Sequence, residues 1–180
     1  MRIRTFATLA GGLALSLGTH AVDLHPGGVY VQGGLAERAT YSATVGVLWL
    51  WSWRAEGLGG EFSGLTEVYA SYWSGRTATG RQGFTQVGLL PMLRYRFSEG
   101  RSDWFLEAGI GVSGMDSLYR TNDKQFSSSF NFTDVLGVGR SFGAQRKSEV
   151  SVRVTHYSNA GIKKPNPGEN FVQLRYAVLF

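Results

Sequence analysis

The sequence predicts an all-β protein: an eight-stranded antiparallel transmembrane β-barrel with short periplasmic turns. Three observations support this class. About eight runs of residues alternate between apolar and polar side chains, as expected of strands whose neighbours point to opposite faces. The runs are about 10 residues or longer, as a tilted spanning strand requires, whereas strands of soluble domains average about 5–6. Aromatic residues gather at the ends of the apolar faces, as in interfacial girdles.

The first 21 residues have the plan of a secretory signal peptide. Basic residues in MRIR precede the small and apolar residues of TFATLAGGLALSLG, and Thr19, His20 and Ala21 offer a cleavage position. The apolar stretch is shorter than a spanning helix of about 20 residues. We therefore expect residues 1–21 to be removed and residues 22–180 to form one barrel domain.

The runs that we expect to be strands follow one another with turn-prone stretches such as RAEGLGG and GAQRKS between them. They lie near residues 28–37, 40–53, 61–73, 83–97, 103–115, 126–142, 147–158 and 170–180. In the second run, Tyr41, Ala43 and Val45 share one face and Ser42 and Thr44 the other. The fourth, fifth and eighth runs alternate in the same way, and the chain stops on an alternating strand at Phe180.

The polar face of these runs carries charges that an eight-stranded barrel would enclose. Such a barrel is filled by its own side chains and is not a pore. The residues expected to point inward are Arg94, Arg96, Glu107, Arg153 and Arg175. Because lone buried charges are costly, we expect them to pair with one another and to serve the structure. A soluble lipocalin-like barrel is the alternative fold.

Composition narrows the functional classes. The chain has no cysteine, which excludes a disulfide frame and thiolate metal ligands. Its net charge of +5 is scattered, without the basic stripe and stacking aromatics of a nucleic-acid-binding module. We expect no nucleic-acid partner, whereas an anionic lipid surface fits the charge.

The chemically unusual pair is His156 and Ser158, at the outer end of the seventh expected strand. Two-residue periodicity places both on the face of Val150, Val152 and Val154, which meets lipid in a membrane barrel. Polar groups facing hydrocarbon are expensive and tend to be functional. A base and a nucleophile so placed could attack an ester or amide bond at the level of lipid head groups. The alternative is that His156 and Ser158 have no catalytic role and are polar residues among the hydrated lipid head groups.

The wider segment His156-Tyr157-Ser158-Asn159-Ala160-Gly161, with the following KKPNPG, resembles the signature of the lipid A 3-O-deacylase family, PagL. The stretches SYWSG, FLEAGIGV and SSSFNFTDVLGVG are also similar to that family, so the resemblance covers most of the mature chain. It implies an eight-stranded barrel of the bacterial outer membrane that hydrolyses the 3-linked hydroxyacyl ester of lipid A with no metal and no cofactor.

The resemblance also implies roles for residues. Ser158 would be the nucleophile and His156 its general base, and Asn159 falls on a position important for activity. We expect Asn159 or nearby backbone N–H groups, including that of Gly161, to stabilise an oxyanion.

The acidic residue that would orient His156 is less well defined by the sequence. The family has a glutamate just beyond this segment, where a gapless count places Asn170, and Asn170 also has outward parity. We favour Glu169, swung outward by a bulge, because a carboxylate stabilises an imidazolium better. Asn170 as the orienter of His156 and Asp134 on the neighbouring strand remain the alternatives.

Lipid A, or the lipopolysaccharide that contains it, is the partner expected in the outer leaflet of the outer membrane. A homodimer is a further possible assembly.

Two other functions are the alternatives: another lipid-modifying barrel enzyme (an acyltransferase or phospholipase), and a structural or adhesive barrel without catalysis. An acyltransferase would need an acyl-chain pocket inside the barrel, and a calcium-dependent phospholipase would need acidic loops. The loops here, such as RTATGRQG, are basic.

Overall fold

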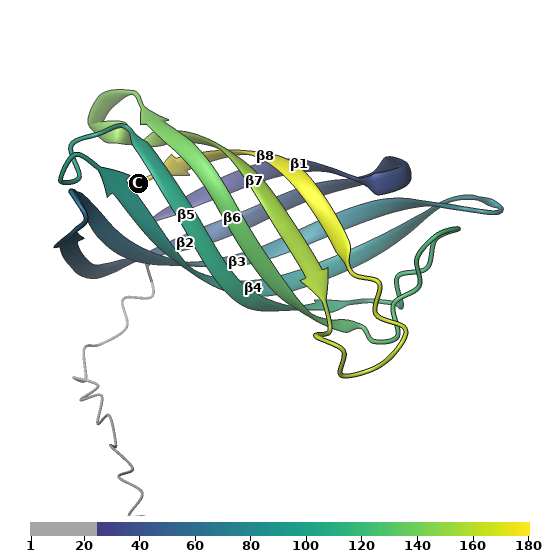
Figure 1. The fold of residues 1–180 in the computed structure, drawn as a ribbon. Coiled ribbons are helices and arrows are strands. Elements are labelled where there is room, and N and C mark those ends of the chain that lie inside the picture. The colour runs from purple at the N-terminus through teal and green to yellow at the C-terminus, as the bar shows by residue number, and fades with distance from the viewer. Residues whose placement is uncertain (1–24) are drawn as a thin grey trace, which may run out of the picture.

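The protein is described here by a computed structural model, whose described part is residues 25–180; the expected signal peptide, residues 1–21, lies outside it. Eight antiparallel strands form one closed barrel (Figure 1). They are β1 (Gly28–Ala36), β2 (Thr40–Gly57), β3 (Gly60–Thr77), β4 (Gly80–Phe97), β5 (Trp104–Met115), β6 (Phe130–Phe142), β7 (Ser148–Ser158) and β8 (Glu169–Leu179).

Each strand pairs with the next in sequence, and β1 pairs with β8 to close the ring. The closure confirms the predicted fold class. Four strands differ from the predicted ranges by three residues or more. Strands β2, β3 and β4 each span 18 residues, because their pairing continues up to the turns at 58–59 and 78–79, with a shift of register between Leu50 and Arg54 on β2. Strand β6 begins at Phe130 rather than near 126, because the residues before it fold over the barrel end.

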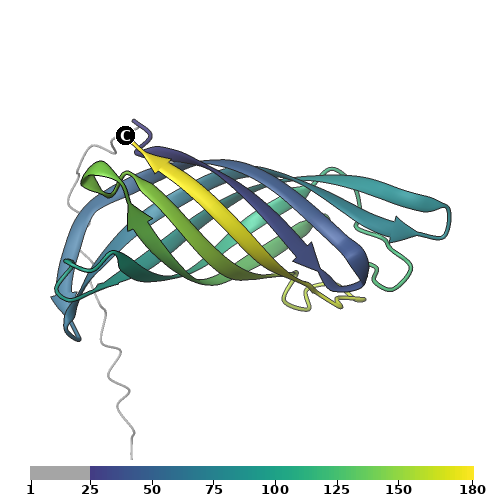
Figure 2. The ribbon, with the colours of Figure 1, turned by 90° about the horizontal axis from the view of Figure 1, so that it is seen from above.

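The two ends of the barrel differ. The short-turn end carries the connections at 58–59, 98–103 and 143–147 together with the C-terminus (Figures 1 and 2). The loop end carries the longer connections, 116–129 and 159–168, and the protruding β3–β4 hairpin. Bacterial outer-membrane barrels have short periplasmic turns and longer external loops. By that rule the loop end faces outward from the cell.

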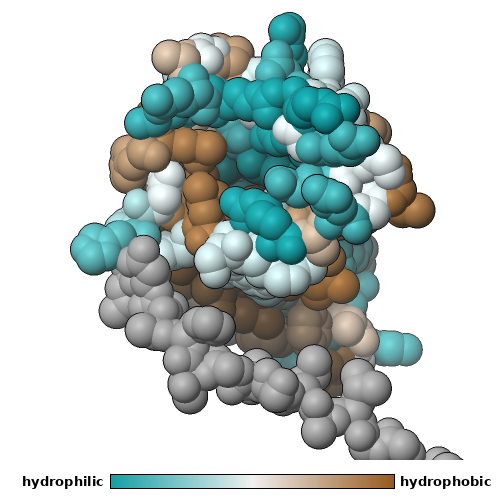
Figure 3. All heavy atoms as spheres, turned by 90° about the vertical axis from the view of Figure 1, so that its left-hand side faces the viewer, coloured by the Kyte–Doolittle hydropathy of each residue, from teal (hydrophilic) through white to brown (hydrophobic). Residues whose placement is uncertain are grey.

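The outward-facing side chains of the wall are apolar. Val150, Val152 and Val154 on β7 are exposed and alternate with buried Ser151, Arg153 and Thr155. The short-turn end presents mostly hydrophilic residues, with hydrophobic ones along its flanks (Figure 3). An apolar exterior and a polar interior invert the pattern of a soluble protein and are typical of a membrane barrel. Within residues 25–180, no helix has the length and apolar character needed to span a bilayer.

A network of ion pairs fills the middle of the barrel. Arg153 donates to Glu67 at 2.7 and 2.9 Å and to Glu107 at 2.7 Å. Arg94 donates to Glu149 at 2.7 Å and to Glu107 at 3.2 Å. The inward positions predicted for Arg94, Glu107 and Arg153 are confirmed, and so is that of Arg175, whose Nη2 lies 3.4 Å from Oε1 of Glu67.

Arg96 is also directed inward but is only partly buried. It donates to Ser141 at 2.9 Å. Glu67 and Glu149, which complete the network, were not singled out from the sequence. Its members come from five strands, and the pair of Arg153 with Glu67 forms across the barrel interior, between β7 and β3.

An aromatic cluster closes the interior near the loop end. Its buried members are Trp73, Phe84, Met115, Tyr119, Phe126, Tyr157 and Phe171. The ring of Trp73 contacts those of Tyr157 and Phe171 at centroid distances of 4.8 and 4.7 Å. Tyr157 and Phe171 are sequence neighbours of outward-facing residues on β7 and β8. This cluster therefore supports the wall from inside at the level of the site described next.

Candidate active site on the outer wall

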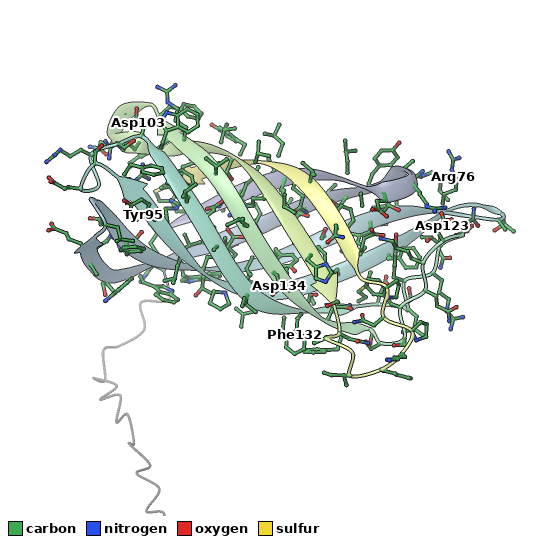
Figure 4. All side chains as sticks on the ribbon, viewed as in Figure 1. Arg76, Tyr95, Asp103, Asp123, Phe132 and Asp134 are labelled. Carbon is green, nitrogen blue, oxygen red and sulfur yellow. The ribbon has the colours of Figure 1, made fainter. Side chains whose placement is uncertain are left out.

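His156 and Ser158 lie at the loop end of β7 with outward parity and half-buried side chains. Buried Tyr157 separates them in sequence, so the two share one face, roughly 6.6 Å apart along the strand. In Figure 4, Phe132 and Asp134 mark this region on β6, where the register pairs them with Ser158 and His156. The outward placement expected of the pair is what the structure has.

Asn170, on the neighbouring strand β8, contacts the imidazole of His156. Nδ1 of His156 lies 2.7 Å from Oδ1 of Asn170, its register partner on β8. Because a carbonyl oxygen only accepts, Nδ1 carries the proton in this contact, and Nε2 is left as the basic nitrogen. Among the three candidates, Asn170 is thus the residue whose side chain is within hydrogen-bond distance of His156.

Asp134 is the register partner of His156 on β6, so it lies beside the imidazole on the strand opposite Asn170. Its side chain is half-buried on the outer wall, in agreement with the expected parity. Asp134, His156 and Asn170 thus form a row across three adjacent strands.

Glu169 does not occupy the outward position that we favoured from the sequence. Its side chain is inside the barrel, where the residue is 1% exposed. Oε2 accepts a hydrogen bond from Tyr119 at 2.8 Å, and Oε1 accepts one from Lys124 Nζ at 2.8 Å. Strand β8 begins at Glu169 in regular register opposite Tyr157, so the expected bulge is missing. The inward direction follows from the strict alternation of β8.

Tyr119 belongs to the connection 116–129 and also contacts Thr40 Oγ1 at 3.1 Å. Burial and the neighbouring Glu169 carboxylate raise the pKa of the Tyr119 phenol. The phenol therefore keeps its proton and stays a donor to Glu169 over the usual pH range.

Asn159, which follows Ser158, ties two loops together. Its side-chain amide donates to Ser127 Oγ at 3.2 Å, Ser128 Oγ at 3.0 Å and the Lys163 carbonyl at 2.9 Å. Its backbone N–H donates to Asn166 Oδ1 at 3.1 Å. Asn159 is buried, and its side chain is engaged in holding the turn and donates no hydrogen bond to Ser158.

The backbone N–H donor close to Ser158 comes from Ala160. Its backbone N lies 3.4 Å from Ser158 Oγ, whereas the N–H of Gly161 donates to Asn159 Oδ1 at 3.0 Å. Ala160 and Gly161 both have positive φ, 51° and 77°. Successive N–H groups in such turns form concavities that accept negative charge. The N–H of Gly161, which we expected to stabilise an oxyanion, is thus engaged within the turn, and Ala160 is the donor nearer to Ser158.

Gly168 is a residue of the site that the sequence did not single out. A Cβ added there would lie 2.7 Å from His156 Cε1 and 3.3 Å from its Nε2, and its φ is +66°. The imidazole thus packs against a glycine that allows both the turn and the close approach. The Pro-Asn-Pro-Gly stretch was the only signal for it.

The fold and this polar row on an apolar outer wall define the class: an outer-membrane β-barrel enzyme. The family model described as lipid A 3-O-deacylase (PagL) matches residues 37–178. A lipid A deacylase PagL of Bordetella bronchiseptica is 33% identical over 93% of this chain and 92% of its own length, and one of Pseudomonas aeruginosa is 30% identical over 92% and 94%.

A crystal structure of the outer membrane enzyme PagL superimposes with a TM-score of 0.74 at 31% identity, covering 85% of this chain and 99% of that one. The chain belongs to the lipid A 3-O-deacylase (PagL) family. It is an ester hydrolase of the outer membrane, which removes the non-catalytic structural barrel from consideration.

Proposed function

We propose that this enzyme hydrolyses the 3-O-linked hydroxyacyl ester of lipid A in the outer leaflet, with Ser158 as nucleophile and His156 as base on the lipid-facing wall. The observation that carries the proposal is the hydrogen bond between His156 Nδ1 and Asn170 Oδ1, beside an outward-facing serine. It selects the tautomer whose Nε2 can take a proton, which a general base must do.

The first half of the reaction acylates the enzyme. Ser158 Oγ attacks the ester carbonyl carbon while Nε2 of His156 takes the hydroxyl proton. The bond between that carbon and the sugar oxygen then breaks, and His156 returns the proton to the sugar oxygen. Asn170 orients the imidazole throughout, in the manner of Cys-His-Asn enzymes.

The second half releases the fatty acid. Water attacks the acyl-serine carbonyl and gives a proton to Nε2 of His156. The bond to Ser158 Oγ breaks, Oγ recovers the proton, and the hydroxy fatty acid leaves. In both halves the Ala160 N–H would stabilise the negative oxygen, because it is the donor nearest to Ser158.

Two features favour a glycolipid substrate. Ser158 is paired with Phe132 on β6, and the outer face of its own strand continues as the exposed Val154, Val152 and Val150, so an acyl chain can approach along an apolar wall without leaving the bilayer. Lys163 and Lys164 are exposed in the connection 159–168, next to Ser158, where they could meet lipid A phosphates through charge-assisted contacts.

The packed interior disfavours the acyltransferase alternative. An internal acyl-chain pocket would have to displace the ion-pair network, and the cavity between Tyr30, Glu67 and Arg153 is only about 10 Å³.

The assembly of two copies into a homodimer remains a prediction.

Mass spectrometry of lipid A from cells with the enzyme, without it, and with Ser158→Ala tests the proposal. We expect the native enzyme alone to remove one hydroxyacyl chain. Ser148→Ala, at the far end of the same strand, is the matched control and should behave as the native enzyme. Deacylation by Ser158→Ala would refute the serine mechanism. Lipid A of unchanged mass in cells with the native, correctly folded enzyme would refute the substrate.

A further inference from the structure

One carboxylate inside the barrel is directly connected to the site on its outer wall. Glu169, at the start of β8, immediately precedes Asn170, so the two side chains leave the same piece of backbone on opposite sides of the wall. The carboxylate faces the aromatic cluster, and the amide of Asn170 faces His156.

Glu169 is held by two partners from one loop. Lys124 and Tyr119 both belong to the connection 116–129 and donate to different oxygens of the carboxylate, each at 2.8 Å. Oε1, the oxygen that accepts from Lys124, also accepts from the backbone N–H of Asn170 at 3.2 Å. The carboxylate therefore fixes the backbone from which the imidazole partner projects.

Lys124 also links the start of β8 to the turn at the end of the neighbouring strand β1. Its Nζ lies 3.5 Å from Glu37 Oε2, and the neighbouring Asp123 pairs with Arg38 in the same turn, η1 (Glu37–Ala39). The lysine side chain is 14% exposed, so solvent screens the pair with Glu169 only weakly. Figure 4 places Asp123 at the loop end beside the β3–β4 hairpin that carries Arg76.

We propose that Lys124 and Glu169 are positioning residues, which set the orientation of Asn170, and through it His156, from inside the barrel. The proposal rests on the serine–histidine mechanism proposed above. A buried carboxylate that loses its only cation must find new partners or take up a proton. Either change moves the start of β8. An active-site displacement of about 1 Å can lower the rate by up to a hundredfold.

The pair also makes the site sensitive to the external loop. Within the connection 116–129, Ser127 and Ser128 bind Asn159, whereas Lys124 and Tyr119 attach the same connection to the site through Glu169. Loss of this attachment should reduce kcat more than it raises KM, because it disturbs the base and not the surface where lipid binds.

The test compares four purified full-length proteins in detergent micelles with lipid A as substrate: native, Lys124→Met, Glu169→Gln, and the double variant. Lys124→Met leaves an unpaired buried carboxylate, so we expect kcat to fall roughly ten- to a hundredfold with KM nearly unchanged. Glu169→Gln keeps an acceptor for Tyr119 and should lose less. The double variant has no unpaired charge and should regain most of the kcat that Lys124→Met loses.

Lys147→Met, at the short-turn end, is the control for removal of a lysine and should keep native kcat. Thermal unfolding followed by circular dichroism identifies any variant that has lost the barrel, and for such a variant Lys124→Gln replaces Lys124→Met. Full kcat in folded Lys124→Met, or a double variant no better than Lys124→Met, would overturn the positioning role. Ser158→Ala in the same series separates the two proposals: if that variant is active, the mechanism itself has failed.

Discussion

Nδ1 of His156 and Oδ1 of Asn170 lie 2.7 Å apart on neighbouring strands of the outer wall. The acceptor is an amide and not a carboxylate, so in the proposed mechanism the imidazolium would be oriented without a full counter-charge from this residue. The five predictions below test that arrangement and the barrel that carries it.

Ser158→Ala should lower kcat by roughly 10³-fold or more, because the acyl-enzyme can no longer form. Rates of fatty-acid release from lipid A micelles measure it. Binding of lipid A should persist, since the apolar wall around the site is unchanged. A variant that keeps more than a tenth of native kcat would contradict the nucleophile assignment.

Asn170→Ala should lower kcat about ten- to a hundredfold, because the imidazole loses the partner that fixes its tautomer and its plane. Asn170→Asp should keep or exceed native kcat, since it retains an oxygen at Nδ1 and adds a negative charge. Val172→Ala, the next outward residue on β8, is the control. An inactive Asn170→Asp alongside an active Asn170→Ala would reverse our view of this residue.

Asp134→Asn should change kcat by less than about threefold, because Nδ1 of His156 is already engaged by Asn170. The measurement is the pH dependence of kcat for this variant and for the native enzyme. A large loss, with a shift of the limb that reports His156, would show that the carboxylate of Asp134 stabilises the imidazolium across the strands.

Gly168→Ala should reduce kcat by roughly tenfold or more, since its methyl group would overlap His156 Cε1 and its positive φ is strained for alanine. Gly33→Ala is the matched control on the outer wall, because a Cβ there meets nothing within 4 Å. Equal kcat for the two variants would mean that the imidazole does not need the position that the glycine permits.

Arg153→Met should lower the free energy of unfolding by about 3–5 kcal/mol, because Glu67 and Glu107 each lose their closest buried partner. Arg140→Met, on the exposed short-turn side, should lower it by less than about 1 kcal/mol. Urea titrations of both variants refolded in lipid vesicles measure the difference. Similar midpoints would argue that the interior network adds no stability.

Much of the fold followed from alternation alone. The parity of β7 gave the outward direction of His156 and Ser158, and that of β8 correctly placed Asn170 outward. The error was to expect a bulge at Glu169, which assumed that a carboxylate must serve the histidine. The neighbours that satisfy Glu169, Lys124 and Tyr119, are about 50 residues away in a loop whose course no periodic pattern encodes.

The same limit applies to the interior network. Inward parity identified Arg94 and Arg153, but their acceptors depend on which residues face each other across the closed ring. No local sequence pattern on β3 indicates that Glu67 has a partner, because that partner, Arg153, is 86 positions away in the chain. Such pairs are determined by strand number and register, which become known only with the structure.

The tightly filled lumen also determines the side from which the water needed for hydrolysis reaches the site. A space of about 10 Å³ among the buried polar groups has room for roughly one solvent molecule, so the interior is not a reservoir. The water that frees the fatty acid must arrive from the cell exterior, between the sugar head groups. Turnover should therefore fall when divalent cations bridge those head groups and dehydrate the leaflet surface, even though the protein itself is unchanged.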